Sequence, residues 1–480
     1  MHDSSGSDPE TAISADDPAP PESSGSDKSD WSSPAIPAQR IPDHDVLYTV
    51  EPPPRKPRRR ALIATIAVVA VAAGAAAIAV LPFGSRTPAG SLGAAPAAAA
   101  TPSAPPTPYE LAVKALTDQA AALTRHDHAG WMAAVDPRQP ALRKHFEQLY
   151  SSFQALHVTQ FEYQNSTGGT SDGPVELNSE MIFCLSARSC PPYTQSDSGP
   201  SHIPQKLTLK DLNGHWVISK AAKGAYKSQL QPYPWEAGDM VFAQGSRVTV
   251  GAPKSLAGQM KTVLAAADKA ARTDDRFATM VGNPQLRYRV FLATDKAWKT
   301  WYGGNDASYA VAYTIPTGAA GSDVVLHMPK LDGDREELKV VLQHEMGHVA
   351  TLSNLTSGDD ADLWLMEGVA DYIGWLPQRT RQDWNFPAVR DALHGSHPPK
   401  SIVESPLKND ASDRAVARFY GLGHFAVECL ATKYGEARTM NFVRLKLRED
   451  DDLDEAAQQA FGTSFKTVDK GCVTWMKQHS

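Results

Sequence analysis

The chain has 480 residues, a formal net charge of −7 and 42% hydrophobic residues, a size that favours two or three domains. Outside one short basic cluster, no stripe of basic and aromatic residues occurs, so the composition gives no support to nucleic-acid binding. The sequence also contains neither a phosphate-binding glycine loop nor a nucleophile elbow, which argues against P-loop enzymes and α/β serine hydrolases.

Residues 1–60 are expected to form a disordered cytoplasmic tail, because they are rich in Ser, Asp and Pro and have few large apolar side chains. The tail ends in the basic cluster Arg55–Arg60, and the uncharged stretch Ala61–Leu81 follows. A helix of about 20 residues spans about 30 Å, which is the thickness of the hydrocarbon core. We therefore predict a transmembrane helix at 61–82. The basic cluster indicates a cytoplasmic N-terminus, with the rest of the chain outside.

A cleaved signal peptide is the alternative interpretation, since Ala94–Ala100 offers small residues of the kind found at cleavage sites. However, the apolar stretch is longer than a signal h-region and lies behind a long tail, which favours a single-pass anchor. The anchor predicts a location in the cell membrane, with the C-terminal domains extracellular. Residues 83–108 are rich in Ala and Pro and predict an extended linker.

Residues 109–234 predict an accessory domain that begins with helices at Leu111–Leu123 and Leu142–Leu156. We interpret His126 and His128, between these helices, as solvated loop residues. The strand-like segments that follow are Phe161–Asn165, Val175–Leu185, Lys206–Leu212 and His215–Lys220. An Asn-Gly dipeptide between the last two predicts a hairpin turn. This order of helices and antiparallel strands resembles the NTF2-like α+β fold, which implies a recognition or regulatory module.

Four cysteines, Cys184, Cys190, Cys429 and Cys472, all lie on the predicted outer side of the membrane. They lack the spacing of a structural zinc site, and they allow three disulfide pairings. We favour Cys184 with Cys190 and Cys429 with Cys472, because each bridge then stays within its own domain.

Residues 238–480 predict an α+β domain with a small mixed sheet and a mainly helical half. The expected strands are Val241–Val250, Leu286–Ala293, Ala310–Ile315 and Asp323–Met328. The helical half should run from Asp362 to the end and include a helix at Asp413–Lys433 with Gly435 as its C-cap. We interpret His327 as a surface residue of its strand. An active site is expected in the cleft between the two halves.

The segment His344-Glu345-Met346-Gly347-His348 carries the clearest chemical signal in the chain. Asp334 can serve as the N-cap of a helix. Positions i and i+4 of a helix lie on one face, so both histidines can direct ring nitrogens at a single ion. Glu345 can reach a water bound to that ion. Glu367 follows His348 by 19 residues on another predicted helix, and Asp371 lies one turn later on the same face.

These five residues resemble the gluzincin metallopeptidases, the thermolysin and aminopeptidase-like superfamily, whose pattern is HExxH followed by Glu-x-x-x-Asp on the next long helix. The resemblance implies that His344, His348 and Glu367 bind Zn²⁺ and that Glu345 is the general base. It also implies that Asp371 orients a ligand histidine through the free N–H of its ring. The implied activity is hydrolysis of a peptide bond in a peptide or protein substrate.

Two residues are candidates for stabilising the developing oxyanion. Tyr420 resembles the tyrosine that aminopeptidase-like gluzincins place after the third ligand, and His424, one turn later, is the thermolysin-like alternative. Tyr420 is preferred. The chain has no match to the Gly-x-Met-x-Asn segment of the aminopeptidases, so an endopeptidase is expected. In relatives, an edge strand ahead of the zinc helix pairs with extended substrate.

The predicted function is therefore a membrane-anchored, extracytoplasmic zinc endopeptidase with an NTF2-like accessory domain. The alternative is a catalytically inactive surface protein that uses the same gluzincin-like scaffold for binding or sensing. Glu345 favours the enzyme, because zinc binding itself does not require this residue.

Overall fold

The computed structural model describes residues 105–167, 173–191, 199–224, 230–305, 310–318, 321–331, 333–353, 360–407 and 411–480. The predicted tail, the predicted transmembrane helix at 61–82 and most of the predicted linker lie outside the described residues. Within these ranges, no helix combines the length and the apolar character needed to cross a bilayer.

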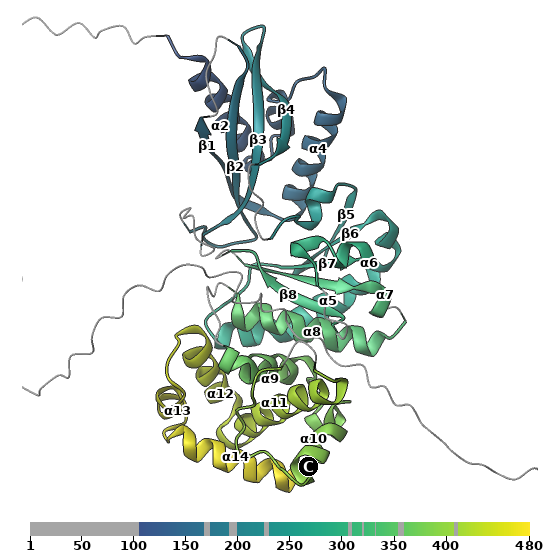
Figure 1. The fold of residues 1–480 in the computed structure, drawn as a ribbon, viewed down its shortest axis with the longest axis vertical. Coiled ribbons are helices and arrows are strands. Elements are labelled where there is room, and N and C mark those ends of the chain that lie inside the picture. Colours follow the sequence, from purple (N-terminus) through teal and green to yellow (C-terminus); the bar gives the residue numbers. More distant parts are fainter. Residues whose placement is uncertain are drawn as a thin grey trace, which may run out of the picture. The chain divides into compact units, whose positions relative to one another are not determined.

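A four-stranded antiparallel sheet lies in the first part of the described chain, with its strands in the order β1-β2-β3-β4 (Figure 1). The strands are β1 (Val158–Thr167), β2 (Val175–Leu185), β3 (Ser201–Leu212) and β4 (His215–Lys223). The helices α2 (Pro108–Thr124), α3 (His128–Ala133) and α4 (Pro140–Ala155) precede it. Asn213 and Gly214 have φ values of 55° and 85°, as the predicted hairpin turn requires. His126 and His128 are exposed as predicted, although His128 begins α3 instead of lying in a loop.

A five-stranded mixed sheet follows, in the order β5-β6-β7-β9-β8. Its strands are β5 (Met240–Gln244), β6 (Val248–Pro253), β7 (Tyr288–Ala293), β8 (Ala312–Pro316) and β9 (Ser322–His327). The three central strands are parallel, and β5 and β8 are antiparallel to their neighbours. The prediction of a single strand at 241–250 is wrong, because the chain reverses at Gly245. The carboxylate of Asp268 accepts hydrogen bonds from the N–H groups of Ser246 and Arg247 at 2.8 and 2.9 Å and so stabilises this turn.

Helices make up most of the remaining chain. The longer ones are α5 (Met260–Met280), α8 (Arg335–Leu352), α9 (Leu363–Gly374), α10 (Phe386–His394), α11 (Asp413–Tyr434), α12 (Glu436–Val443), α13 (Leu453–Phe461) and α14 (Phe465–His479). The short ones are η1 (Pro234–Ala237), η2 (Lys254–Gln259), α6 (Asp295–Trp298), η3 (Trp301–Gly303), α7 (Met328–Leu331), η4 (Asp360–Asp362), η5 (Thr380–Gln382) and η6 (Arg444–Arg448). Helix α11 ends at Gly435 with φ 90°, as predicted. The sequence patterns did not predict α5, which packs on β6 and α8.

Helix α8 contacts the second sheet through β8 and β9 and also contacts α9 (Figure 1). Its side chains are therefore buried on most sides, including an unbroken run from Val340 to Thr351. The polar residues in this run need partners inside the protein, because water cannot solvate them.

The connection between the two sheets is buried among aromatic side chains of both. The Trp235 ring centroid lies 6.1 Å from that of Phe183 on β2 and 5.8 Å from that of Phe291 on β7. Tyr233 stacks on Trp235 at 4.8 Å. One hydrophobic core therefore includes residues of both sheets.

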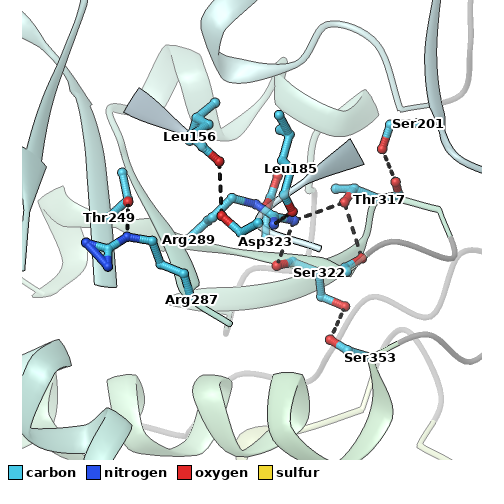
Figure 2. A network of polar contacts seen from close by, with 12 residues as sticks. Leu156, Leu185, Ser201, Thr249, Arg287, Arg289, Thr317, Ser322, Asp323 and Ser353 are labelled. Atoms are coloured by element: carbon cyan, nitrogen blue, oxygen red, sulfur yellow. Dashed lines mark hydrogen bonds and ion pairs between the residues drawn. The ribbon is translucent and has the colours of Figure 1, made fainter. Parts of the chain in front are cut away.

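A buried polar network joins the end of β2, the strands β7 and β9, and the end of α8 (Figure 2). Arg289 of β7 forms an ion pair with Asp323 of β9 and donates a hydrogen bond to the carbonyl oxygen of Leu185, at the end of β2, at 2.6 Å. It also donates to the carbonyl oxygen of Ser322 at 3.3 Å, and the Ser322 hydroxyl accepts a hydrogen bond from Ser353, the C-cap of α8, at 2.8 Å. Because Arg289 and Asp323 are only 3% and 0% exposed, each charge depends on the other for compensation.

The interpretation of His327 as a surface residue is wrong. Its side chain is buried, stacks on Trp298 with the ring centroids 4.6 Å apart, and bonds to Asp295 through Nε2 at 2.8 Å. The α6 turn that carries both partners covers this end of β9, which the sequence pattern of the strand alone did not reveal.

Both favoured disulfides are present. Cys184 is bonded to Cys190, and Cys429 is bonded to Cys472. The second bridge ties α11 to α14 across a sequence separation of 43 residues.

Candidate metal centre

Helix α8 is fixed at both ends by hydrogen bonds to its backbone. At the first turn, the predicted N-cap Asp334 accepts hydrogen bonds from the N–H groups of Glu336 and Glu337 at 2.9 and 3.0 Å. At the last turn, Asn283 donates to the carbonyl oxygens of Val349 and Ala350. Arg448 donates to the carbonyl oxygens that follow, those of Thr351 and Ser353, at 3.0 Å each. Several of the orphan groups at both ends thus have partners, which helps to hold the helix in place against its neighbours.

Three side chains from α8 and α9 bring their donor atoms to one point. His344 Nε2 lies 3.1 Å from His348 Nε2 and 3.4 Å from Glu367 Oε2, and the third distance, from His348 Nε2 to Glu367 Oε2, is 3.3 Å. Donors held at about 2.0–2.1 Å from a tetrahedral ion lie about 3.3 Å from one another. The three distances therefore match the edges of one tetrahedral face. Two imidazoles and one carboxylate are also a known donor set of catalytic zinc.

Close backbone contact between α9 and α11 places Glu367 at this point. A Cβ atom added at Gly368 would lie 2.6 Å from the carbonyl oxygen of Gly423, and one added at Gly423 would lie 2.9 Å from the carbonyl oxygen of Trp364. Only glycine at both positions allows this approach. Glu367, the third donor, directly precedes Gly368, so the contact between the two glycines fixes the position of Glu367.

Asp371 holds the first histidine from the other side of its ring. Its Oδ1 lies 2.8 Å from His344 Nδ1, so a His344 ring that donates its Nδ1 hydrogen to Asp371 directs the lone pair of Nε2 toward His348 and Glu367. Asp371 therefore contacts the ring of a predicted ligand, and its orienting role stays a prediction.

Burial and mutual charge set the protonation of the donors. Burial raises the pKa of Glu367, but the charges of His348 and His344 and their hydrogen bonds outweigh it and lower the pKa to about 2. Burial lowers the pKa of His348. Burial also disfavours protonation of His344, yet the hydrogen bonds with Asp371 and Glu367 prevail and raise its pKa well above the usual value. Glu367 and His348 are thus already in their metal-binding forms, while His344 must lose a proton to bind a metal.

Glu345 lies beside this donor set without joining it. Its Oε2 accepts a hydrogen bond from the Thr314 hydroxyl at 2.8 Å, and that hydroxyl also lies 2.9 Å from the Glu345 carbonyl oxygen. In the described part of the chain, Glu345 Oε1 has no hydrogen-bond partner. Burial raises the pKa of Glu345 to about 7. One oxygen is therefore anchored, and the other remains available to accept a proton.

The two oxyanion candidates differ in their surroundings, although both lie on α11. The Tyr420 ring centroid is 6.3 Å from that of His344, so the two rings are neighbours. His424 bonds through Nδ1 to Asp383 Oδ2 at 2.9 Å, one helical turn further along. Both side chains are buried. The preference for Tyr420 as the oxyanion residue stays a prediction.

Two residues of the centre were not predicted. Thr314 is a β-branched residue in a strand, where threonine is common, so its sequence context carries no functional signal. Asp383 follows η5 in a connection, and only the folded chain brings it to His424, which is 41 positions later.

No protein-family model matches this chain, and no curated protein sequence matches it. Among solved structures, the chain is similar to an M1 zinc metallopeptidase from Deinococcus radiodurans at 16% identity and a TM-score of 0.31, over 56% of this chain and 58% of that one. It is also similar to native LTA4 hydrolase from yeast at 11% identity and a TM-score of 0.33, over 65% of this chain and 58% of that one. The matched region spans little more than half the length of either structure, and similarity at this level does not establish a family.

Proposed function

We propose that this protein is a zinc-dependent peptidase. The observation that carries the proposal is the convergence of His344 Nε2, His348 Nε2 and Glu367 Oε2 at 3.1–3.4 Å from one another in a buried site. Without an ion, two imidazoles and a carboxylate are buried with little beyond one another and Asp371 to compensate their polar atoms and charges, which is costly. A metal ion held by His344, His348 and Glu367 removes this cost.

The residues around the donor set supply the parts of a hydrolytic reaction. When bound, zinc would polarise a substrate carbonyl and make water more acidic. Glu345 Oε1 takes a proton from the attacking water and passes it to the leaving amine, while the hydrogen bond from Thr314 holds Oε2. The Tyr420 hydroxyl donates to the carbonyl oxygen as negative charge develops there. Asp371 keeps the His344 ring in the binding orientation.

Strand β8 is the proposed binding edge for an extended peptide. It is the last strand of the mixed sheet and pairs with β9, and its other edge pairs with no strand among the described residues. Thr314, on this strand, bonds to Glu345, so a peptide added along the free edge would lie next to the general base. Binding along a strand does not require a free peptide terminus, which supports an endopeptidase.

The proposed location is the outer face of a membrane, with the segment 61–82 as a single-pass anchor and the N-terminus in the cytoplasm. The apolar composition of that segment and the basic cluster before it support this placement. The two disulfides also support it, since such bonds persist in oxidising compartments. The four-stranded sheet with its helices is the proposed NTF2-like accessory module.

An inactive binding protein is the second candidate, and one observation favours it. His344, Glu345 and His348 are each 0% exposed, as expected of a site that holds a structural ion. The two candidates differ in what they predict for Glu345, because a structural ion needs no general base.

Digestion of a peptide library by the full chain tests the proposal, with Glu345→Gln and His348→Ala as variants. We expect cleavage by the wild type, loss of cleavage with about one zinc per chain retained in Glu345→Gln, and loss of zinc in His348→Ala. Equal cleavage by wild type and Glu345→Gln would contradict the peptidase proposal. Zinc bound with no cleavage by either protein would favour the inactive binding protein.

A further inference from the structure

A second group of buried polar side chains lies behind Asp371. Asp371, Asp383 and His424 each offer an oxygen or ring nitrogen, and these three atoms lie within 4.8 Å of one another. The three side chains are 0%, 3% and 1% exposed. They come from α9, from the connection after η5 and from α11, so the fold brings together residues that are distant in the sequence.

Two members of this group hold each other firmly. His424 Nδ1 donates to Asp383 Oδ2 at 2.9 Å, and Asp383 Oδ1 accepts a hydrogen bond from the backbone N–H of Asn385 at 2.7 Å. Both oxygens of Asp383 are therefore engaged. The His424 ring is fixed by this bond and by the helix that carries it.

Asp371 is only half engaged. Its Oδ1 bonds to His344 Nδ1, whereas its Oδ2 is buried and has no hydrogen-bond partner within the described ranges. A carboxylate held by a single bond can still rotate about its side chain and lose its alignment with His344. The imidazole of His424 is the neighbouring group that can restrain the second oxygen, through one water that donates to both Asp371 Oδ2 and the free ring nitrogen of His424.

We propose that Asp383 and His424 are positioning residues that hold Asp371, and through it His344, in the orientation that binds the metal. In this series, Asp383 fixes the ring of His424, His424 restrains the carboxylate of Asp371, and Asp371 orients the ring of His344. This inference rests on the metal site proposed above and assigns His424 a role other than oxyanion stabilisation.

The placement of His424 agrees with this role. His424 and Tyr420 are one turn apart on the same face of α11, and the ring of Tyr420 is the one beside His344. His424 lies one turn further along the helix, and its Nδ1 is already engaged by Asp383. The same face of α11 thus supplies one residue to the metal centre and one to the support of Asp371.

The test is a double-mutant cycle on zinc affinity, measured by competition with a chelator on the full chain. Partners directly behind a metal ligand, as Asp371 is behind His344, typically contribute about 10–100-fold in metal affinity, and Asp383 acts two steps further away. We expect Asp383→Asn to weaken zinc binding by about tenfold, at the lower end of that range. In a chain that already carries Asp371→Asn, the same change should alter affinity by less than about twofold, because the residue through which it acts is gone.

Glu428→Gln is the matched control. Glu428 lies one turn after His424 on α11, is 8% exposed, and accepts a hydrogen bond from the backbone N–H of Thr380 at 2.8 Å. It therefore ties the same helix to the same connection without belonging to the group around Asp371. Its substitution should lower the melting temperature but leave zinc affinity within about twofold of wild type. If Asp383→Asn does not fold, substitutions of His424 provide the test instead. His424→Gln keeps a hydrogen-bond donor, so it should bind zinc more tightly than His424→Leu.

The outcomes separate this inference from the proposed function. If the wild type binds no zinc, the proposed metal site fails and the positioning role fails with it. The positioning role alone is contradicted if the wild type binds one zinc but Asp383→Asn does not change its affinity, or changes it equally with and without Asp371→Asn. Two zinc ions per wild-type chain, one of them lost in Asp383→Asn, would show a second metal site and would also overturn it.

Discussion

Replacing Thr314 with valine tests how Glu345, the proposed general base, is held. The change removes the hydroxyl that donates to Glu345 Oε2 at 2.8 Å and keeps the β-branched shape that the strand requires. Thr314 is 3% exposed, so water does not readily replace the lost donor. A hydrogen bond to a charged group contributes about 1.5–3 kcal/mol, and at 1.4 kcal/mol per factor of ten this corresponds to about 10–150-fold. We expect kcat to fall by that factor.

The matched variant is Thr314→Ser, which keeps the hydroxyl and should retain activity within about threefold of wild type. Zinc content should be unchanged in both variants, because the hydroxyl of Thr314 bonds to Glu345, which is not one of the three proposed metal donors. The assay measures kcat and KM on a peptide that the wild type cleaves. The reasoning is refuted if Thr314→Val has wild-type kcat, or if the serine and valine variants lose equal activity.

Three further predictions concern how the fold supports the site, and equilibrium unfolding of the folded variants checks each of them. Gly368→Ala should lower the free energy of unfolding by about 1–3 kcal/mol, since the new Cβ would lie 2.6 Å from a backbone oxygen of α11. It should also weaken zinc binding, which chelator competition measures. A variant with wild-type zinc affinity would contradict the packing described. Replacing both Cys429 and Cys472 with alanine removes their bridge and should lower the free energy of unfolding by about 4 kcal/mol, the value expected for a closed loop of 43 residues. A decrease below about 1 kcal/mol would contradict this. Arg289→Met should lower the free energy of unfolding by about 3–5 kcal/mol, because it leaves the charge of the buried Asp323 uncompensated. An unchanged free energy of unfolding would show that the ion pair is dispensable for stability.

The sequence predicted that His344, His348 and Glu367 come together as a candidate metal site, because the signal is local. The spacing of His344 and His348 fixes their relation on any helix, and Glu367 and Asp371 repeat that relation on the next one. The strand β2 and the helix α11 were also predicted closely, since an alternating pattern bounds the first and a glycine ends the second. Both disulfide pairings followed from keeping each bridge within one domain.

Other parts of the structure depend on tertiary contacts and could not be predicted. Helix α5 is an exception, because its buried residues Met260, Val263, Ala267, Ala270, Ala271 and Phe277 recur at helical spacing, a signal in the sequence that our interpretation missed. The hairpin between β5 and β6 is stabilised by a carboxylate of α5, which lies more than 20 positions later. Asp383 and Thr314 become functional candidates only when the fold brings them to His424 and Glu345.

The most direct test of the metal centre is an anomalous difference map, recorded at the zinc absorption edge from crystals of the zinc-loaded protein. We expect one strong peak about 2.0–2.2 Å from His344 Nε2, His348 Nε2 and Glu367 Oε2. A map with no peak among these three atoms, or with its strongest peak elsewhere, would contradict the metal site and the hydrolytic function proposed from it.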